Sequence, residues 1–104
     1  MGTLFYGGAA EPVHIEDRLL AHLKVVISTK LRRNECFTLS WVHQEGDTPG
    51  RSTLWMHPAI PLRFVFDARE PGELRSDWIV ALANSASSSG GISLLPELMS
   101  PPSE

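Results

Sequence analysis

The chain has 104 residues and a hydrophobic content of 42%, enough for one buried core without disulfides or a structural metal. A formal charge of -3 and a pI near 5.8 exclude a general attraction of the whole molecule to nucleic acid or anionic membranes. Cys36 is the single cysteine, which excludes a disulfide framework. Because no leader-like or membrane-spanning apolar stretch is present, we expect a cytoplasmic protein without a membrane partner.

The N-terminal part of the chain predicts a hairpin followed by an amphipathic helix. Residues 3–6 and 13–15 alternate as strands do, and the glycine-containing turn 7–10 can reverse the chain between them. Glu16 or Asp17 stands where a carboxylate caps a helix start, and Asn34 suits its left-handed end. On a helical projection of residues 17–33, the leucine-rich stripe should face a sheet, whereas His22 falls on the opposite stripe.

Three strand-like segments follow this helix. They cover residues 35–43, residues 51–57 and a stretch that ends near Phe66, and we interpret them as a meander. Read with a period of two, the following residues share the buried face: Phe37, Leu39, Trp41, Leu54, Met56, Ile60, Leu62, Phe64 and Phe66. Prolines at 58 and 61 place this last connection or strand at a sheet edge.

The C-terminal part of the chain predicts a shorter helix and one last strand. Leu74, Trp78, Ile79 and Leu82 recur at helical spacing in residues 73–86, and residues 92–95 can form a strand. The sequence therefore predicts a single α+β domain over residues 1–97, in the order ββαβββαβ, with a largely antiparallel sheet and two helices packed on one face. Residues 98–104 are expected to form a flexible tail.

The opposite face of the predicted meander carries the most suggestive side chains. It comprises Thr38, Ser40, Val42, Thr53, Trp55, His57, Arg63 and Val65. Such a surface is open to three interpretations: packing inside the fold, self-association, or contact with a ligand or nucleic acid, since tryptophan and arginine serve in all of these roles. We take Trp55, His57 and Arg63 as the candidate binding residues.

Basic residues outnumber acidic ones by three between positions 17 and 63, and both flanks are acidic. Arg32, Arg33 and Arg51 are therefore added to the candidate binding surface. The alternative for the two helix-terminal arginines is that they offset the helix dipole and keep the protein soluble.

No catalytic or metal-binding motif is recognisable in the sequence. The four histidines are scattered without the spacing of a metal site, so neither a metal nor a cofactor is expected. Cys36 lies at a strand start without an oxyanion turn, which favours a buried structural thiol, and Ser87, Ser88 and Ser89 are interpreted as a flexible connector.

Five segments carry a resemblance to a known family. They are MGTLFYG, EDRLLAHLKVVISTKLRRNE, FTLSW, GRSTLWMHPAIPLRFVF and DWIVALANSA with the GI and LLPE that follow it. Together they resemble small uncharacterised actinobacterial proteins that often carry the label ATP-dependent DNA ligase. A ligase needs a nucleophilic lysine in a KxDG motif, and neither Lys24 nor Lys30 lies in one, so the resemblance assigns no catalytic residue.

Three functional hypotheses follow. The first is a small non-catalytic binding or accessory module that self-associates or contacts nucleic acid or a partner protein. The second is an accessory component of an ATP-dependent DNA ligase or of other nucleotide chemistry. The third is a structural homodimer.

Overall fold

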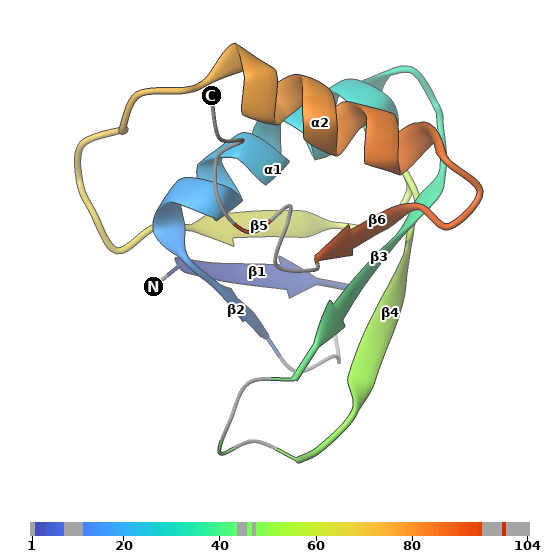
Figure 1. Cartoon of the computed structure of the whole chain (residues 1–104), viewed down its shortest axis with the longest axis horizontal. Coiled ribbons are helices and arrows are strands. Elements are labelled where there is room, and N and C mark those ends of the chain that lie inside the picture. The colour runs from blue at the N-terminus through green and yellow to red at the C-terminus, as the bar shows by residue number, and fades with distance from the viewer. Residues whose placement is uncertain (1, 8–11, 44–45, 47, 95–98, 100–104) are drawn as a thin grey trace.

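The computed structural model describes residues 2–7, 12–43, 46, 48–94 and 99. Its elements run in the predicted order ββαβββαβ, which confirms the α+β fold class (Figure 1). Their bounds are β1 (Gly2–Tyr6), β2 (Val13–Ile15), α1 (Asp17–Arg32), β3 (Phe37–Val42), β4 (Arg51–Met56), β5 (Leu62–Val65), α2 (Ser76–Ser87) and β6 (Ile92–Leu94).

Both ends of α1 are defined by the residues that the sequence indicated. The Glu16 carboxylate accepts hydrogen bonds from the backbone N–H groups of Arg18 and Leu19, which satisfies two donors of the first turn. At the other end Asn34 has a φ of 61°, the left-handed conformation that lets the chain leave the helix. Helix α1 therefore delivers the chain directly into β3.

The strands form two three-stranded sheets, in the orders β2-β1-β5 and β4-β3-β6. All pairs are antiparallel except β3 with β6, so the predicted largely antiparallel character is confirmed. The predicted meander is wrong in one respect, because β5 pairs with β1 rather than with β4. The proline-containing connection between β4 and β5 carries the chain to the other sheet, where the Gly7 N–H donates to the Pro61 carbonyl.

Both helices pack on the same side of the sheets, as predicted (Figure 1). The core between them contains side chains from every helix and from both sheets, among them Leu4, Leu23, Leu39, Met56 and Leu82, all fully buried. Burying one such leucine contributes about 1.5–3 kcal/mol. The inner faces of both sheets are therefore used by the core, and their outer faces point away from the helices.

The start of α2 and the environment of His22 differ from the prediction. Helix α2 begins at Ser76, so Leu74 precedes it and is 51% exposed. His22 is fully buried rather than on a solvent-facing stripe, because α2 packs against that side of α1. Its Nε2 accepts the Arg75 N–H at 2.9 Å and its Nδ1 lies 2.7 Å from the Arg18 carbonyl, while its ring contacts Trp78.

Part of the predicted C-terminus cannot be compared. The tail predicted for residues 98–104 lies outside the described residues except for Met99, which is exposed. Among the helices of the described part of the chain, none has the length and apolar character to cross a membrane.

Candidate functional site

The outer face of the β4-β3-β6 sheet carries the candidate residue Trp55. Trp55 is 56% exposed, which is unusual for a residue with a large aromatic side chain. Trp55 lies opposite Thr38 in the β3–β4 ladder, and four residues earlier Arg51 lies opposite Val42. We call the outer-facing residues Thr38, Ser40, Val42, Arg51, Thr53 and Trp55 the Trp55 face. Of the three interpretations made from the sequence, packing of Trp55 inside the fold is wrong.

Hydroxyl groups lie beside Trp55 on the same sheet. Ser40 and Thr53 are cross-strand partners, and their side-chain oxygens are 2.8 Å apart. Ser93 of β6 is the partner of Ser40 on its other side, so a row of three hydroxyl-bearing residues crosses the sheet. This row gives the Trp55 face hydrogen-bonding groups that can act as donors or acceptors.

Arg63 does not share a sheet with Trp55. It lies on β5 opposite Phe5 of β1, and its guanidinium carbon is 5.8 Å from the centre of the Phe5 ring. Phe5 is 38% exposed. The geometry is that of a cation–π pair on an open surface, so the outer face of the β2-β1-β5 sheet presents its own aromatic and cationic group.

His57 follows β4 and belongs to a turn rather than to the Trp55 face. Its Nδ1 accepts the Ala59 N–H at 3.0 Å, which holds the imidazole against its own backbone. Trp55, His57 and Arg63 are therefore placed in three environments. Of the other candidate binding residues, only Arg51 lies on the Trp55 face.

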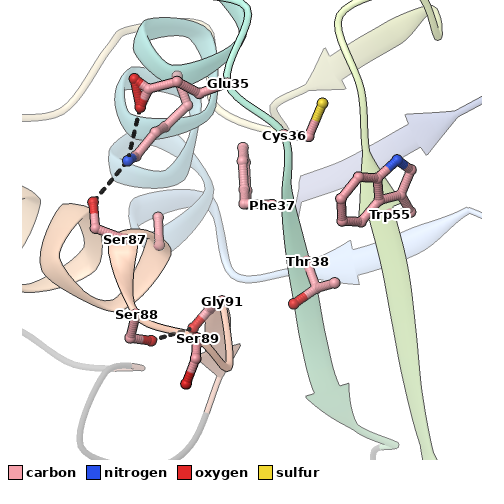
Figure 2. Close-up of a pocket in the computed structure, with 11 residues that line it drawn as sticks. Glu35, Cys36, Phe37, Thr38, Trp55, Ser87, Ser88, Ser89 and Gly91 are labelled. Atoms are coloured by element: carbon pink, nitrogen blue, oxygen red, sulfur yellow. Dashed lines mark hydrogen bonds and ion pairs between the residues drawn. The ribbon is translucent and has the colours of Figure 1, made fainter.

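A hollow of about 450 Å³ borders Trp55 on the side of the helix ends (Figure 2). Its walls come from the end of α1, the start of β3 and the end of α2, and it is lined by Lys30, Glu35, Cys36, Phe37, Thr38, Trp55, Ala86, Ser87, Ser88, Ser89 and Gly91. The Lys30 ammonium donates to the Glu35 carboxylate at 3.0 Å and to the Ser87 hydroxyl at 2.7 Å. Arg32 and Arg33, both exposed, lie at this same end of α1.

Two expectations about this region are wrong. Cys36 is exposed rather than buried. It directly precedes β3, and its thiol and the Phe37 ring point to opposite sides of the chain (Figure 2). Ser87 belongs to α2 rather than to a connector, and the residues that follow it form a hydrogen-bonded turn. In this turn the Ser88 hydroxyl donates to the Ser85 carbonyl at 2.6 Å, and the Gly91 N–H donates to the Ser88 carbonyl.

The groups that could support metal or nucleotidyl chemistry are dispersed. No group of three or more metal-ligating side chains occurs among the residues that the structure describes. His43 is engaged in the β3–β4 turn, where its ring nitrogens lie 2.7 Å from the Thr48 carbonyl and 2.7 Å from the Ser52 hydroxyl. Lys24 is exposed on α1 and Lys30 is held by Glu35, so the two lysines do not converge on one site.

Residues 1–97 match the model of a domain family described as a domain of unknown function, DUF7882. The chain belongs to this family. Neither a curated protein nor a solved structure matches it. The DUF7882 domain thus includes both sheets, both helices and the whole Trp55 face.

Two surface features of this DUF7882 domain were missed from the sequence. Phe5 belongs with Arg63, and its position between the buried Leu4 and Tyr6 in a strand already indicates an outward-pointing ring. Ser93 extends the hydroxyl row, but only the parallel register of β6 with β3 reveals this, and no local pattern encodes that register.

Proposed function

We propose that this DUF7882 domain is a non-catalytic binding module that contacts single-stranded nucleic acid through the Trp55 face. The observation that carries the proposal is the exposure of Trp55, which is 56% accessible on the outer face of its sheet. Proteins that bind single strands without strict sequence preference use such exposed aromatic rings on sheets as stacking platforms.

The stacking contribution favours single strands over duplexes. A base that stacks on an aromatic side chain contributes about 1–3 kcal/mol, but inside a duplex its faces are already covered by neighbouring bases. Phe5, with the Arg63 guanidinium above its ring, offers a second surface of the same kind on the neighbouring sheet. Two platforms allow more than one base of a strand to be held.

The positive charge needed for phosphate contact is local. Arg51 lies on the Trp55 face, and Arg32 and Arg33 lie at the end of α1 that borders the hollow beside Trp55. Because the whole chain carries a formal charge of -3, local cationic groups such as these have to favour the approach of a polyanion. Binding should therefore be modest in affinity and sensitive to salt.

The hydroxyl row supplies hydrogen bonds without strict base selection. Ser40, Thr53 and Ser93 can each donate to or accept from a base edge or a sugar. A hydroxyl that can exchange its donor and acceptor roles discriminates weakly between bases. The module should therefore prefer single strands as a class over any one short sequence. The resemblance to proteins labelled as DNA ligases makes DNA the first ligand to test.

Titration of a dye-labelled oligothymidylate, followed by fluorescence anisotropy, tests the proposal. Trp55→Ala should weaken binding by about tenfold or more, which corresponds to the loss of one stacked base. Val80→Ala is the matched control, because Val80 is equally exposed, at 55%, but lies on α2. If three arginines contact phosphates, the logarithm of the association constant should fall linearly with the logarithm of the salt concentration, with a slope of about -2. Equal binding by wild type and Trp55→Ala would contradict the proposal.

A further inference from the structure

Strand β4 is an edge strand of its sheet. It pairs with β3 on one side, and on its other side it has no strand partner among the described residues. The direction of each peptide group follows from the ladder. The His43 N–H donates to the Gly50 carbonyl, and these two residues continue the β3–β4 register, so they form a hydrogen-bonded pair. Hydrogen-bonded and non-hydrogen-bonded pairs alternate along antiparallel strands. Consequently, Arg51, Thr53 and Trp55 direct their N–H and C=O groups away from β3.

Two other contacts agree with this assignment. The Ser40 and Thr53 side chains approach to 2.8 Å, as expected for the closer, non-hydrogen-bonded type of pair. The Trp55 carbonyl accepts a hydrogen bond from the Tyr6 hydroxyl, which is possible only if that carbonyl points away from β3. Tyr6 therefore occupies one end of the edge, and Arg51 and Thr53 remain without a backbone partner outside the β3–β4 ladder in the described part of the chain.

We propose that this edge pairs with β4 of a second copy of the chain, antiparallel and centred on Ser52. In this register Arg51 of each copy forms a hydrogen-bonded pair with Thr53 of the other, which gives four main-chain hydrogen bonds. Trp55 then lies opposite Pro49 of the second copy. Proline has no N–H to donate, and the Trp55 carbonyl already has a donor in Tyr6, so the pairing ends there without an unsatisfied carbonyl.

Three neighbouring symmetric registers fit less well, and one of them, centred on Arg51, places the Thr53 carbonyl opposite Pro49, which has no N–H to donate. Centring the pairs on Thr53 or on Leu54 requires the Trp55 carbonyl to accept from the second copy while it holds the Tyr6 hydroxyl. The Ser52-centred register also places Arg51 of one copy diagonally across from Trp55 of the other, within reach of a cation–π contact. The result is a continuous six-stranded sheet that joins the two Trp55 faces. The pairing goes beyond the proposed nucleic-acid contact and does not depend on it.

Sedimentation velocity without any nucleic acid tests the pairing over a series that reaches about 1 mM, because four main-chain hydrogen bonds alone give a weak complex. Thr53→Pro removes the outward N–H but none of the main-chain hydrogen bonds to β3, and it should raise the dimer dissociation constant by about tenfold or more. Thr53→Val is the matched control, since it loses only the hydroxyl. A wild-type protein that stays monomeric throughout the series would overturn the proposal.

Disulfide trapping tests the register even if Thr53→Pro does not fold. In a Cys36→Ser background, Ser52→Cys places two thiols directly opposite each other, with Cα atoms about 4.5 Å apart. Thr53→Cys places the two thiols two residues out of register, so that their Cα atoms are farther apart than the roughly 7 Å that a disulfide spans. Mild oxidation should give covalent dimers of Ser52→Cys alone. Dimers of Thr53→Cys alone, equal amounts of both or no dimers would contradict the Ser52-centred pairing.

Discussion

The Tyr6 hydroxyl on β1 donates a hydrogen bond to the Trp55 carbonyl on β4, and this contact links the two sheets. Tyr6 itself is only 9% exposed, so its phenol is directed from the core toward the edge of β4. The bond occupies the backbone of the residue whose ring is the centre of the Trp55 face. The position of Trp55 relative to the other sheet therefore depends on a residue that is far away in the sequence.

Removing this bond should cost stability in a pH-dependent way. Tyr6→Phe is expected to lower the free energy of unfolding by about 0.5–1.5 kcal/mol at neutral pH in urea titrations. Burial raises the pKa of the Tyr6 phenol above 10.0, so the fold favours the neutral hydroxyl. The contribution of the neutral hydroxyl to the free energy of unfolding is present below the ordinary pKa of tyrosine and is lost as the pH rises through the pKa of the folded protein.

Tyr6 is the only tyrosine, so the absorbance of tyrosinate reports on it alone. The folded protein should ionise this group at higher pH than the urea-unfolded protein. Tyr6→Phe should lack the part of the fall in stability at alkaline pH that is caused by ionisation of the Tyr6 phenol. Identical ionisation curves for the folded and unfolded chains would show that the phenol is not held in the contact described.

Gly91 lies where the loop after α2 meets β3. Its φ is +67°, and a Cβ at this position would collide with the hydroxyl and the carbonyl of Thr38. We expect Gly91→Ala to destabilise the domain by about 2 kcal/mol or more, because it combines left-handed backbone with a clash against main chain. Thermal unfolding measures the effect. Gly90→Ala is the control, since a Cβ there meets nothing within 4 Å, and comparable losses for the two variants would be inconsistent with this packing.

His22 connects α1 to the first turn of α2 in the core. His22→Leu removes the acceptor of the Arg75 N–H and should lower the free energy of unfolding by about 1–3 kcal/mol. His22→Gln offers a side-chain oxygen near the position of Nε2, so it should restore part of this loss. Chemical denaturation of both variants checks the prediction, and a Leu variant as stable as the Gln variant would argue against a role for the hydrogen bond.

Asp17 fastens the chain after β5 to the start of α1. Its carboxylate accepts the N–H groups of Ala68 and Asp67, at 2.9 Å and 3.2 Å, and these bonds hold its pKa below 3.8. The stabilisation is present above the ordinary pKa and is lost as pH falls through the lower folded pKa.

Asp17→Asn should therefore be less stable than wild type near neutral pH, and the difference should shrink under strongly acidic conditions. Thermal unfolding across this range measures the difference. Glu70→Gln, at an exposed position, is the control and should show no such trend. A difference between Asp17→Asn and wild type that is constant with pH would contradict the assignment.

The sequence was most informative where structure is local. Both ends of α1 follow from the carboxylate at Glu16 and the left-handed Asn34, which act on their immediate neighbours. The alternation in β3 and β4 separated the exposed Trp55 from the buried Met56 for the same reason. Such patterns fix which face a residue occupies, but they do not fix which strand lies next to it.

The errors that affect the candidate site most concern distant neighbours, whereas the others concern the ends of elements. Nothing within β5 indicates that its partner is β1, so Arg63 was grouped with Trp55 although it contacts Phe5. A helical projection places His22 opposite the leucine-rich stripe, because the projection does not contain α2, which covers this residue. The sequence pattern predicts a buried Cys36, because it does not resolve that this residue lies one position before β3.

The most direct measurement of the proposed function is a nitrogen–proton NMR titration with oligothymidylate that follows the indole N–H signals of the three tryptophans. Trp55 is exposed, whereas Trp78 is 1% exposed and serves as an internal reference within the same spectrum. We expect the Trp55 signal and the amides of β3 and β4 to shift or broaden as the strand is added, while the Trp78 signal stays in place. A spectrum that does not change, or changes confined to the helices, would contradict binding through the Trp55 face.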